Sequence, residues 1–170
     1  MDLSSPNRLG QVFYAANVSA KSVIAVAAAM TGVIIYNPVG SRKNLVIADM
    51  GWTWTTAPAA IHQIGFGISP ISSTLPTSVT AIGSGVKQAN GAGNAGTSVT
   101  QAYDAATLAA APVAARWIGG AVATGGTAPY MIFDHVDGAL MLAPGSAGAF
   151  IALSTTAIGV GSITWIEVPV

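Results

Sequence analysis

Short apolar runs separated by turn residues constrain the fold of this 170-residue chain more than any other feature. Most runs span about four to eight residues, and Gly, Pro, Asn, Asp and Ser cluster between them, which is the pattern of strands joined by turns. No segment sustains the 3.6-residue hydrophobic period of an amphipathic helix. The pattern predicts strands at residues 11–17, 22–28, 33–37, 44–55, 60–69, 98–103, 113–119, 130–136, 139–143, 147–154 and 162–168.

These strands predict an all-β protein, namely an antiparallel β-sandwich of the jelly-roll type. The length suits one domain, and we assign residues 11–170 to it. Residues 1–10 are polar and are expected to form a short N-terminal arm. The Gly-rich stretch at 83–97 is expected to be an exposed, mobile loop, and the Ala-rich segment 104–111 a short helical turn.

Two local patterns make sharper predictions. Strict alternation along residues 44–55 would place Val46, Ala48, Met50, Trp52 and Trp54 on one face of a strand. The dipeptide at residues 137–138, Asp-Gly, is typical of a two-residue hairpin turn, so the strands on either side of it are expected to run back along each other.

Charge is scarce. Only 7% of the residues are charged, with six acids, six bases and a formal net charge of zero. An ordinary globular domain has roughly 25%. Soluble domains usually keep both signs interspersed on the surface. We therefore expect that partners cover much of the exterior and that small polar residues cover the rest.

The same counts exclude several partners. Phosphate binding needs clustered Lys and Arg, so nucleic acid is not an expected partner. The longest apolar stretch, residues 23–36, is shorter than the about 20 residues of a spanning helix, and no membrane partner is expected. The first residues lack the pattern of a secretory signal, which favours synthesis in the cytoplasm.

The sequence gives little support for a catalytic, cofactor-binding or metal-binding site. The chain has no cysteine and two histidines, His62 and His135, and His62 is expected to face solvent or a neighbour. Asp134, His135 and Asp137 alternate between two strand faces and do not converge as metal ligands. The run at 91–96 matches a dinucleotide fingerprint in letters, but no βαβ context surrounds it. We predict no catalytic residue, no cofactor site and no metal site, and therefore no enzyme.

Aromatic side chains offer two readings. The tryptophans could stack on sugars, as in lectin-type jelly rolls, but large aromatics alternating along strands are more often core or subunit-interface anchors. The second reading is favoured. The residues predicted to make assembly contacts are Arg8, Tyr14, Trp52, Trp54 and Trp117.

A series of turns and strand ends resembles small virion proteins of tailed bacteriophages. The segments that carry the likeness are Asn-Pro-Val-Gly-Ser at 37–41, Lys-Asn-Leu-Val at 43–46, Tyr-Asp-Ala-Ala-Thr-Leu at 103–108, Ala-Pro-Val at 111–113 with Arg116, Asp-Gly-Ala at 137–139, Leu-Ala-Pro-Gly at 142–145 and Trp-Ile-Glu-Val-Pro at 165–169. The likeness covers most of residues 11–170 and involves no catalytic motif.

This resemblance implies a capsid decoration or cement subunit with a jelly-roll-like fold. It implies a homotrimer that packs on the major capsid protein, at the capsid surface of a virion assembled in the host cytoplasm. The alternative is the receptor- or glycan-binding head of a phage fibre or spike. No cofactor is implied by either function.

Overall fold

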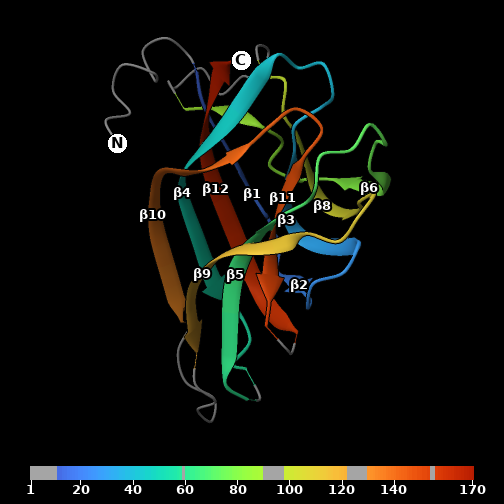
Figure 1. Ribbon diagram of the computed structural model, residues 1–170. Helices are drawn as coiled ribbons and strands as arrows, with labels where there is room; N and C mark the ends of the chain where they lie inside the picture. The colour runs from blue at the N-terminus through green and yellow to red at the C-terminus, as the bar shows by residue number, and fades with distance from the viewer. Residues whose placement is uncertain (1–10, 59, 90–97, 122–129, 154–155) are drawn as a thin grey trace.

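Two antiparallel sheets pack face to face in the computed structural model, which describes residues 11–58, 60–89, 98–121, 130–153 and 156–170 (Figure 1). These residues contain twelve strands and no helix. The strands are β1 (Val12–Ala16), β2 (Lys21–Val23), β3 (Ala29–Tyr36), β4 (Lys43–Trp54), β5 (His62–Ile68), β6 (Thr77–Ala81), β7 (Lys87–Gln88), β8 (Gln101–Thr107), β9 (Val113–Ala121), β10 (Met131–Leu142), β11 (Ala147–Ala152) and β12 (Ala157–Pro169).

Sheet A has the strand order β10-β4-β12-β1-β7, with β2 also paired to β12. Sheet B has the order β6-β8-β3-β11-β5-β9. The prediction of an all-β antiparallel sandwich is therefore confirmed. Strands β9 and β10 are edge strands of different sheets, and they lie at the same side of the sandwich (Figure 1).

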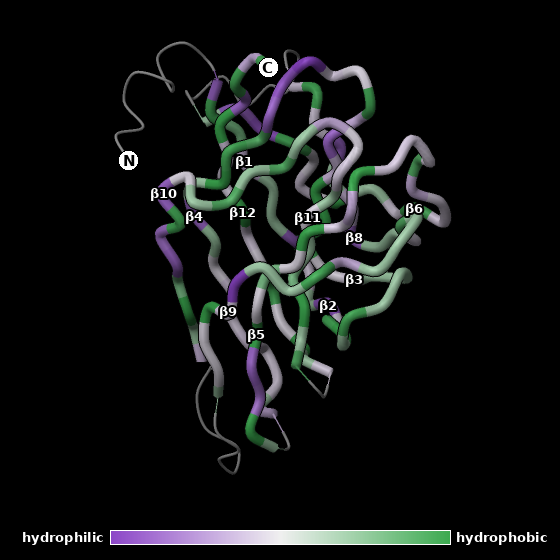
Figure 2. The backbone as a smooth tube through the Cα atoms, in the orientation of Figure 1, coloured by the Kyte–Doolittle hydropathy of each residue, from purple (hydrophilic) through white to green (hydrophobic). Residues whose placement is uncertain are grey.

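The main core fills the space between the sheets with large aromatic side chains. Trp52 of sheet A packs against Phe150 of sheet B, with ring centroids 5.5 Å apart. Trp165 stacks on Phe13 at 6.4 Å within sheet A. Hydrophobic positions run along the strands of both sheets rather than gathering in one segment, as Figure 2 shows. Burial of such rings is the main source of stability for a sandwich of this size.

A second apolar cluster lies on the outer face of sheet B. Its largest members are Met30, Ile34, Tyr36 and Ile151. The segment after β5 runs over this cluster, where Ser72 N donates to Gly145 O at 2.9 Å. Sheet B is consequently buried on both faces along β11, all six residues of which are buried. A strand buried on both faces reads as a continuous apolar run instead of alternating.

The predicted hairpin at residues 137–138 is wrong in its topology. Strand β10 continues through this point and pairs with β4 on both sides of it, with His135 opposite Asp49 and Leu140 opposite Ile47. Asp137 and Gly138 do adopt positive φ angles of 52° and 83°. The dipeptide therefore supplies the backbone conformation that the pattern predicts, but in a β-bulge within one strand.

A bulge also changes the faces of β4. The neighbouring strands β10 and β12 both skip Ala48 in their registers. Leu45 and Ile47 therefore enter the core on one side of the bulge, and Met50, Trp52 and Trp54 on the other. The prediction that Val46 shares their face is wrong, because one unpaired residue reverses the alternation.

Three further differences come from pairing between distant segments. Residues 104–107 belong to β8 and not to a helical turn. Strand β7 lies inside the predicted loop at 83–97, where Tyr14 pairs with Lys87 of that strand. Strand β6 was not predicted, and it pairs with β8. The predicted arm at 1–10, Arg8 and the run at 91–96 lie outside the described residues.

Candidate functional site: internal ion pairs, an apolar face and a tryptophan hollow

Several ionic side chains of the described chain pair with one another, some of them partly buried and one pair exposed. Lys21 Nζ lies 3.0 Å from Asp104 Oδ2, and Lys43 Nζ lies 2.8 Å from Glu167 Oε2. His135 Nδ1 lies 2.7 Å from Asp49 Oδ1. Because these charges are paired, they add little net charge to the exterior. The surface is therefore especially poor in net charge.

Glu167 is the centre of the most extensive polar cluster. Besides Lys43, its carboxylate accepts hydrogen bonds from Ser98 Oγ at 2.6 Å, Val99 N at 3.0 Å and Thr100 Oγ1 at 2.9 Å. Burial by itself raises the pKa of Glu167, but the hydrogen bonds from Lys43, Ser98 and Thr100 outweigh it and hold that pKa below its ordinary value. The cluster fixes the chain just before β8 to strand β12 of the other sheet.

Asp104 makes a second link between the sheets. Asn17 Nδ2, at the end of β1, donates to Asp104 Oδ1 of β8 at 2.7 Å. Gly161 N donates to Asn17 Oδ1 at 3.2 Å, which completes the amide's bonding to sheet A. Buried polar groups with several partners of this kind fix how two sheets are aligned. Asp104 is therefore a structural carboxylate, and none of its contacts suggests a reaction.

Arg116 and Asp134 make the third link, between the edge strands β9 and β10. Arg116 Nε donates to Asp134 Oδ2 at 2.5 Å and Arg116 Nη2 donates to Asp134 Oδ1 at 3.0 Å. The hydrogen bond from Arg116 to Asp134, with the attraction between their charges, raises the pKa of Arg116. The bidentate geometry holds the open side of the sandwich together.

A double-mutant cycle on this pair is expected to give a coupling free energy of about 1 kcal/mol, because the Arg116 side chain is partly exposed. The variants are Arg116→Met, Asp134→Asn and the double substitution, and urea unfolding supplies the free energies. The coupling should shrink in 1 M salt. A coupling of zero in low salt would mean that the pair does not hold β9 to β10.

The outer face of sheet A is apolar at its edge. Met131, Phe133 and Met141 of β10 project from it with 75%, 57% and 51% of their side chains exposed. Behind Phe133 the sheet is nearly bare, because Phe133 pairs with Gly51, which in turn pairs with Ser162. A hollow of about 210 Å³ opens there between Met131, Phe133 and the neighbouring strands. Tyr14 is also exposed on this face.

Strand β10 is an edge strand of sheet A. No strand among the described residues pairs with its far side. Its twelve residues include neither lysine nor proline, the residues that usually guard an edge against pairing. The bulge at residues 136–139 and the carboxylates of Asp134 and Asp137 are the features of this strand that discourage such pairing. We refer to Met131, Phe133, Met141 and Tyr14 together as the apolar face.

The structure separates the residues predicted to make assembly contacts. Trp52 and Trp54 are each only 1% exposed and lie in the core between the sheets, so the prediction is corrected for these two residues. The physical reason is that their face of β4 packs against sheet B, where the Trp52 ring lies 5.5 Å from that of Phe150. Tyr14 and Trp117 are exposed, on the outer faces of sheets A and B respectively.

His62 also differs from its prediction. It is buried, and its ring lies edge-on to Trp54 with centroids 6.3 Å apart. Among the described residues, no three His, Cys, Asp or Glu side chains gather where a metal ion could bind. The described histidines and carboxylates are thus placed for packing and ion pairing.

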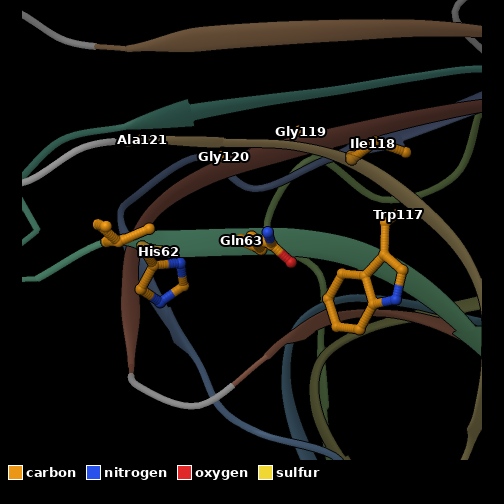
Figure 3. Close-up of a pocket in the computed structure, with 8 residues that line it drawn as sticks. His62, Gln63, Trp117, Ile118, Gly119, Gly120 and Ala121 are labelled. Carbon is orange, nitrogen blue, oxygen red and sulfur yellow. The ribbon is translucent and has the colours of Figure 1, made fainter.

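A hollow of about 460 Å³ lies on the outer face of sheet B, between β5 and β9. Gln63 and Trp117 lie beside Gly119 and Gly120 of β9, and Gly120 is the cross-strand partner of Gln63 (Figure 3). Ile61 borders the hollow and is exposed. Sequence reasoning named Trp117 but missed Gln63, whose position opposite a glycine depends on the register between distant strands.

Comparison with protein-family models, curated proteins and solved structures finds no match to this chain. No helix among the described residues is long and apolar enough to cross a membrane. The class of protein that the fold defines is therefore a two-sheet antiparallel β-sandwich, with an apolar face on one sheet and a tryptophan hollow on the other.

Proposed function

We propose that this chain is a non-enzymatic structural subunit that packs against copies of itself and against a larger shell. The observation that carries the proposal is the apolar face, which combines exposed Met and Phe side chains with a strand edge that no described strand covers. Aromatic residues and Met are enriched at protein interfaces, and charged residues are depleted at interface centres. The exposed pair of His135 with Asp49 borders that face, where the His135 ring contacts Phe133.

The energetics favour such a role. Removal of apolar surface from water contributes about 25 cal/mol per Å². A stable contact buries about 800 Å² on each partner. Contacts without ions are little weakened when salt screens charges. A subunit that reinforces a shell needs area of this type and no reactive group.

The resemblance to tailed-phage virion proteins directs the proposal to one assembly. In this proposal the chain is a capsid cement or decoration subunit, its sandwich is jelly-roll-like, and it acts as a trimer on the major capsid protein at the virion surface. The absence of a match among known families leaves this assignment resting on the turn segments and on the apolar face.

The test is oligomeric state as a function of salt. The wild-type chain at micromolar concentration is expected to sediment as an oligomer, and to remain so in 1 M NaCl. Phe133→Asp is expected to weaken self-association by at least about tenfold, because a charge must be desolvated at the contact. Analytical ultracentrifugation measures both effects.

Val79→Asp provides the matched control. Val79 is exposed on β6 of sheet B, away from the apolar face, so this substitution adds the same charge without changing association. Co-sedimentation with purified capsids then tests the shell contact. A wild-type chain that remains monomeric at all concentrations and leaves capsids unbound would refute the proposed function.

A further inference from the structure

The indole of Trp117 lies flat on sheet B because its cross-strand partner, Gly65, has no side chain. Trp117 pairs with Gly65 of β5, and a Cβ atom built on Gly65 would lie 2.7 Å from Trp117 Cε3. The ring therefore covers the glycine backbone, while 43% of the residue stays exposed. A Trp in this position is a rigid platform with its outward surface available.

The floor beside this platform is also made by glycine. Gln63 pairs with Gly120, and a Cβ atom on Gly120 would lie 3.3 Å from Gln63 Cγ and 2.5 Å from His62 O. No side chain at residue 120 can therefore cover Gln63. Figure 3 shows the Gln63 carboxamide lying along β5 between His62 and the indole.

The chemistry of the lining is neutral and amphipathic. It contains an exposed indole, an exposed carboxamide that can donate and accept, the buried imidazole of His62 and the apolar Ile61 and Ile118, with no Asp, Glu, Lys or Arg. The adjacent Arg116 is neutralised by Asp134. At about 460 Å³, the hollow is within the size range of small-molecule sites.

From this geometry we propose that the Trp117 hollow binds a neutral carbohydrate. One face of a pyranose ring carries C–H groups that pack on an indole, and its hydroxyl groups are hydrogen-bond partners for a carboxamide. An anionic or cationic ligand would find no Asp, Glu, Lys or Arg in the lining. This binding function goes beyond the packing role, uses the opposite sheet and does not depend on that role.

The experiment exploits the burial of the other tryptophans. Of the four in the chain, Trp52, Trp54 and Trp165 are at most 1% exposed, so acrylamide quenching reports on Trp117. An array of neutral glycans identifies binders, and lactose, maltotriose and chitotriose serve as soluble probes. At least one glycan is expected to protect Trp117 saturably from quenching.

Two variants test the platform and the amide. Trp117→Ala is expected to weaken binding, measured by calorimetry, by at least about tenfold. Gln63→Met keeps the shape of the side chain and removes its polar groups, and it is expected to weaken binding by about threefold to tenfold. Val79→Ala, which removes an exposed apolar side chain from β6 at the opposite edge of sheet B, should leave the affinity unchanged.

A silent array, or binding that survives both Trp117→Ala and Gln63→Met, would overturn the proposal. Protection of Trp117 that rises with protein concentration in the absence of sugar would overturn it as well, because a second copy would then occupy the hollow. None of these three results bears on the apolar face, which Phe133→Asp tests separately.

Discussion

Replacement of Trp52 by alanine is expected to destabilise the chain by about 3–5 kcal/mol. Trp52 is 1% exposed and contacts aromatic rings in both sheets, Trp54 at 6.3 Å and Phe150 at 5.5 Å. The truncation would leave a cavity at the centre of the sandwich. The surrounding strands cannot close it, because pairing on both sides fixes β4.

Two glycine residues of β12 also keep the surrounding strands from closing the cavity that Trp52→Ala would leave. Cβ atoms built on Gly159 and Gly161 would lie 2.7 Å and 3.1 Å from atoms of the Trp52 ring. Strand β12 therefore already approaches the indole as closely as a backbone can. Trp52→Phe is expected to lose less stability than Trp52→Ala, because part of the ring volume remains.

Urea unfolding followed by circular dichroism measures these effects. The matched control is Trp117→Ala, which removes the same side chain from the surface and should cost about 1 kcal/mol or less. Equal losses for Trp52→Ala and Trp117→Ala would contradict the placement of Trp52 in the core. Because buried Trp52 cannot reach a partner, its effect on assembly should follow its effect on folding.

The strands of this fold could be predicted where the local pattern agrees with the tertiary pairing. Strand β4 matches its predicted range to within one residue at each end, because its apolar run is long and is bounded by turn residues. Strands β6 and β7 have no such run. They exist because β8 and β1 offer free edges for pairing, which no local pattern reveals.

The bulges explain why the faces were harder to predict than the strands. The conformation of Asp137 and Gly138 was predictable, since this dipeptide favours positive φ. Its consequence was not, because β4 continues past that point and pairs with the chain beyond it. Likewise Ala48 carries no local sign of being skipped by both neighbouring strands.

The candidate sites likewise combine features that the sequence predicts with features that depend on strand pairing. Met131 and Phe133 alternate within a predicted strand, so their common face follows from the sequence. That this strand lies at an edge depends on the strand order. The hollow needs Gln63 beside Gly120 and Trp117 beside Gly65, and both pairs follow from the register of β5 with β9.

Glu167→Gln is expected to cost about 2 kcal/mol at pH 7, and Glu167→Ala about 3 kcal/mol. The carboxylate is almost fully buried, and its partners Ser98, Val99 and Thr100 donate to it from the chain that leads into β8. An amide can accept some of these bonds but must place its own N–H donors among them. Alanine leaves the donors without any acceptor from this position.

The same carboxylate gives the effect of Glu167 a defined pH dependence. Hydrogen bonds from Lys43, Ser98 and Thr100 outweigh burial and hold the folded pKa of Glu167 below its ordinary value of 4.5. The contribution of Glu167 is therefore complete well above pH 4.5 and is lost as pH falls through the lower folded pKa.

The free energies of unfolding of the wild type and Glu167→Gln should differ at pH 7 and converge as pH falls below 4. Urea titrations at pH 7, 4 and 2.5 measure this difference, from which carboxylates common to both proteins cancel. Asp49→Asn, at the exposed pair with His135, is the control and should change the free energy of unfolding by less than about 1 kcal/mol at pH 7. A difference between wild type and Glu167→Gln that stays constant from pH 7 to 2.5 would show that the charge of Glu167 does not hold the sheets together.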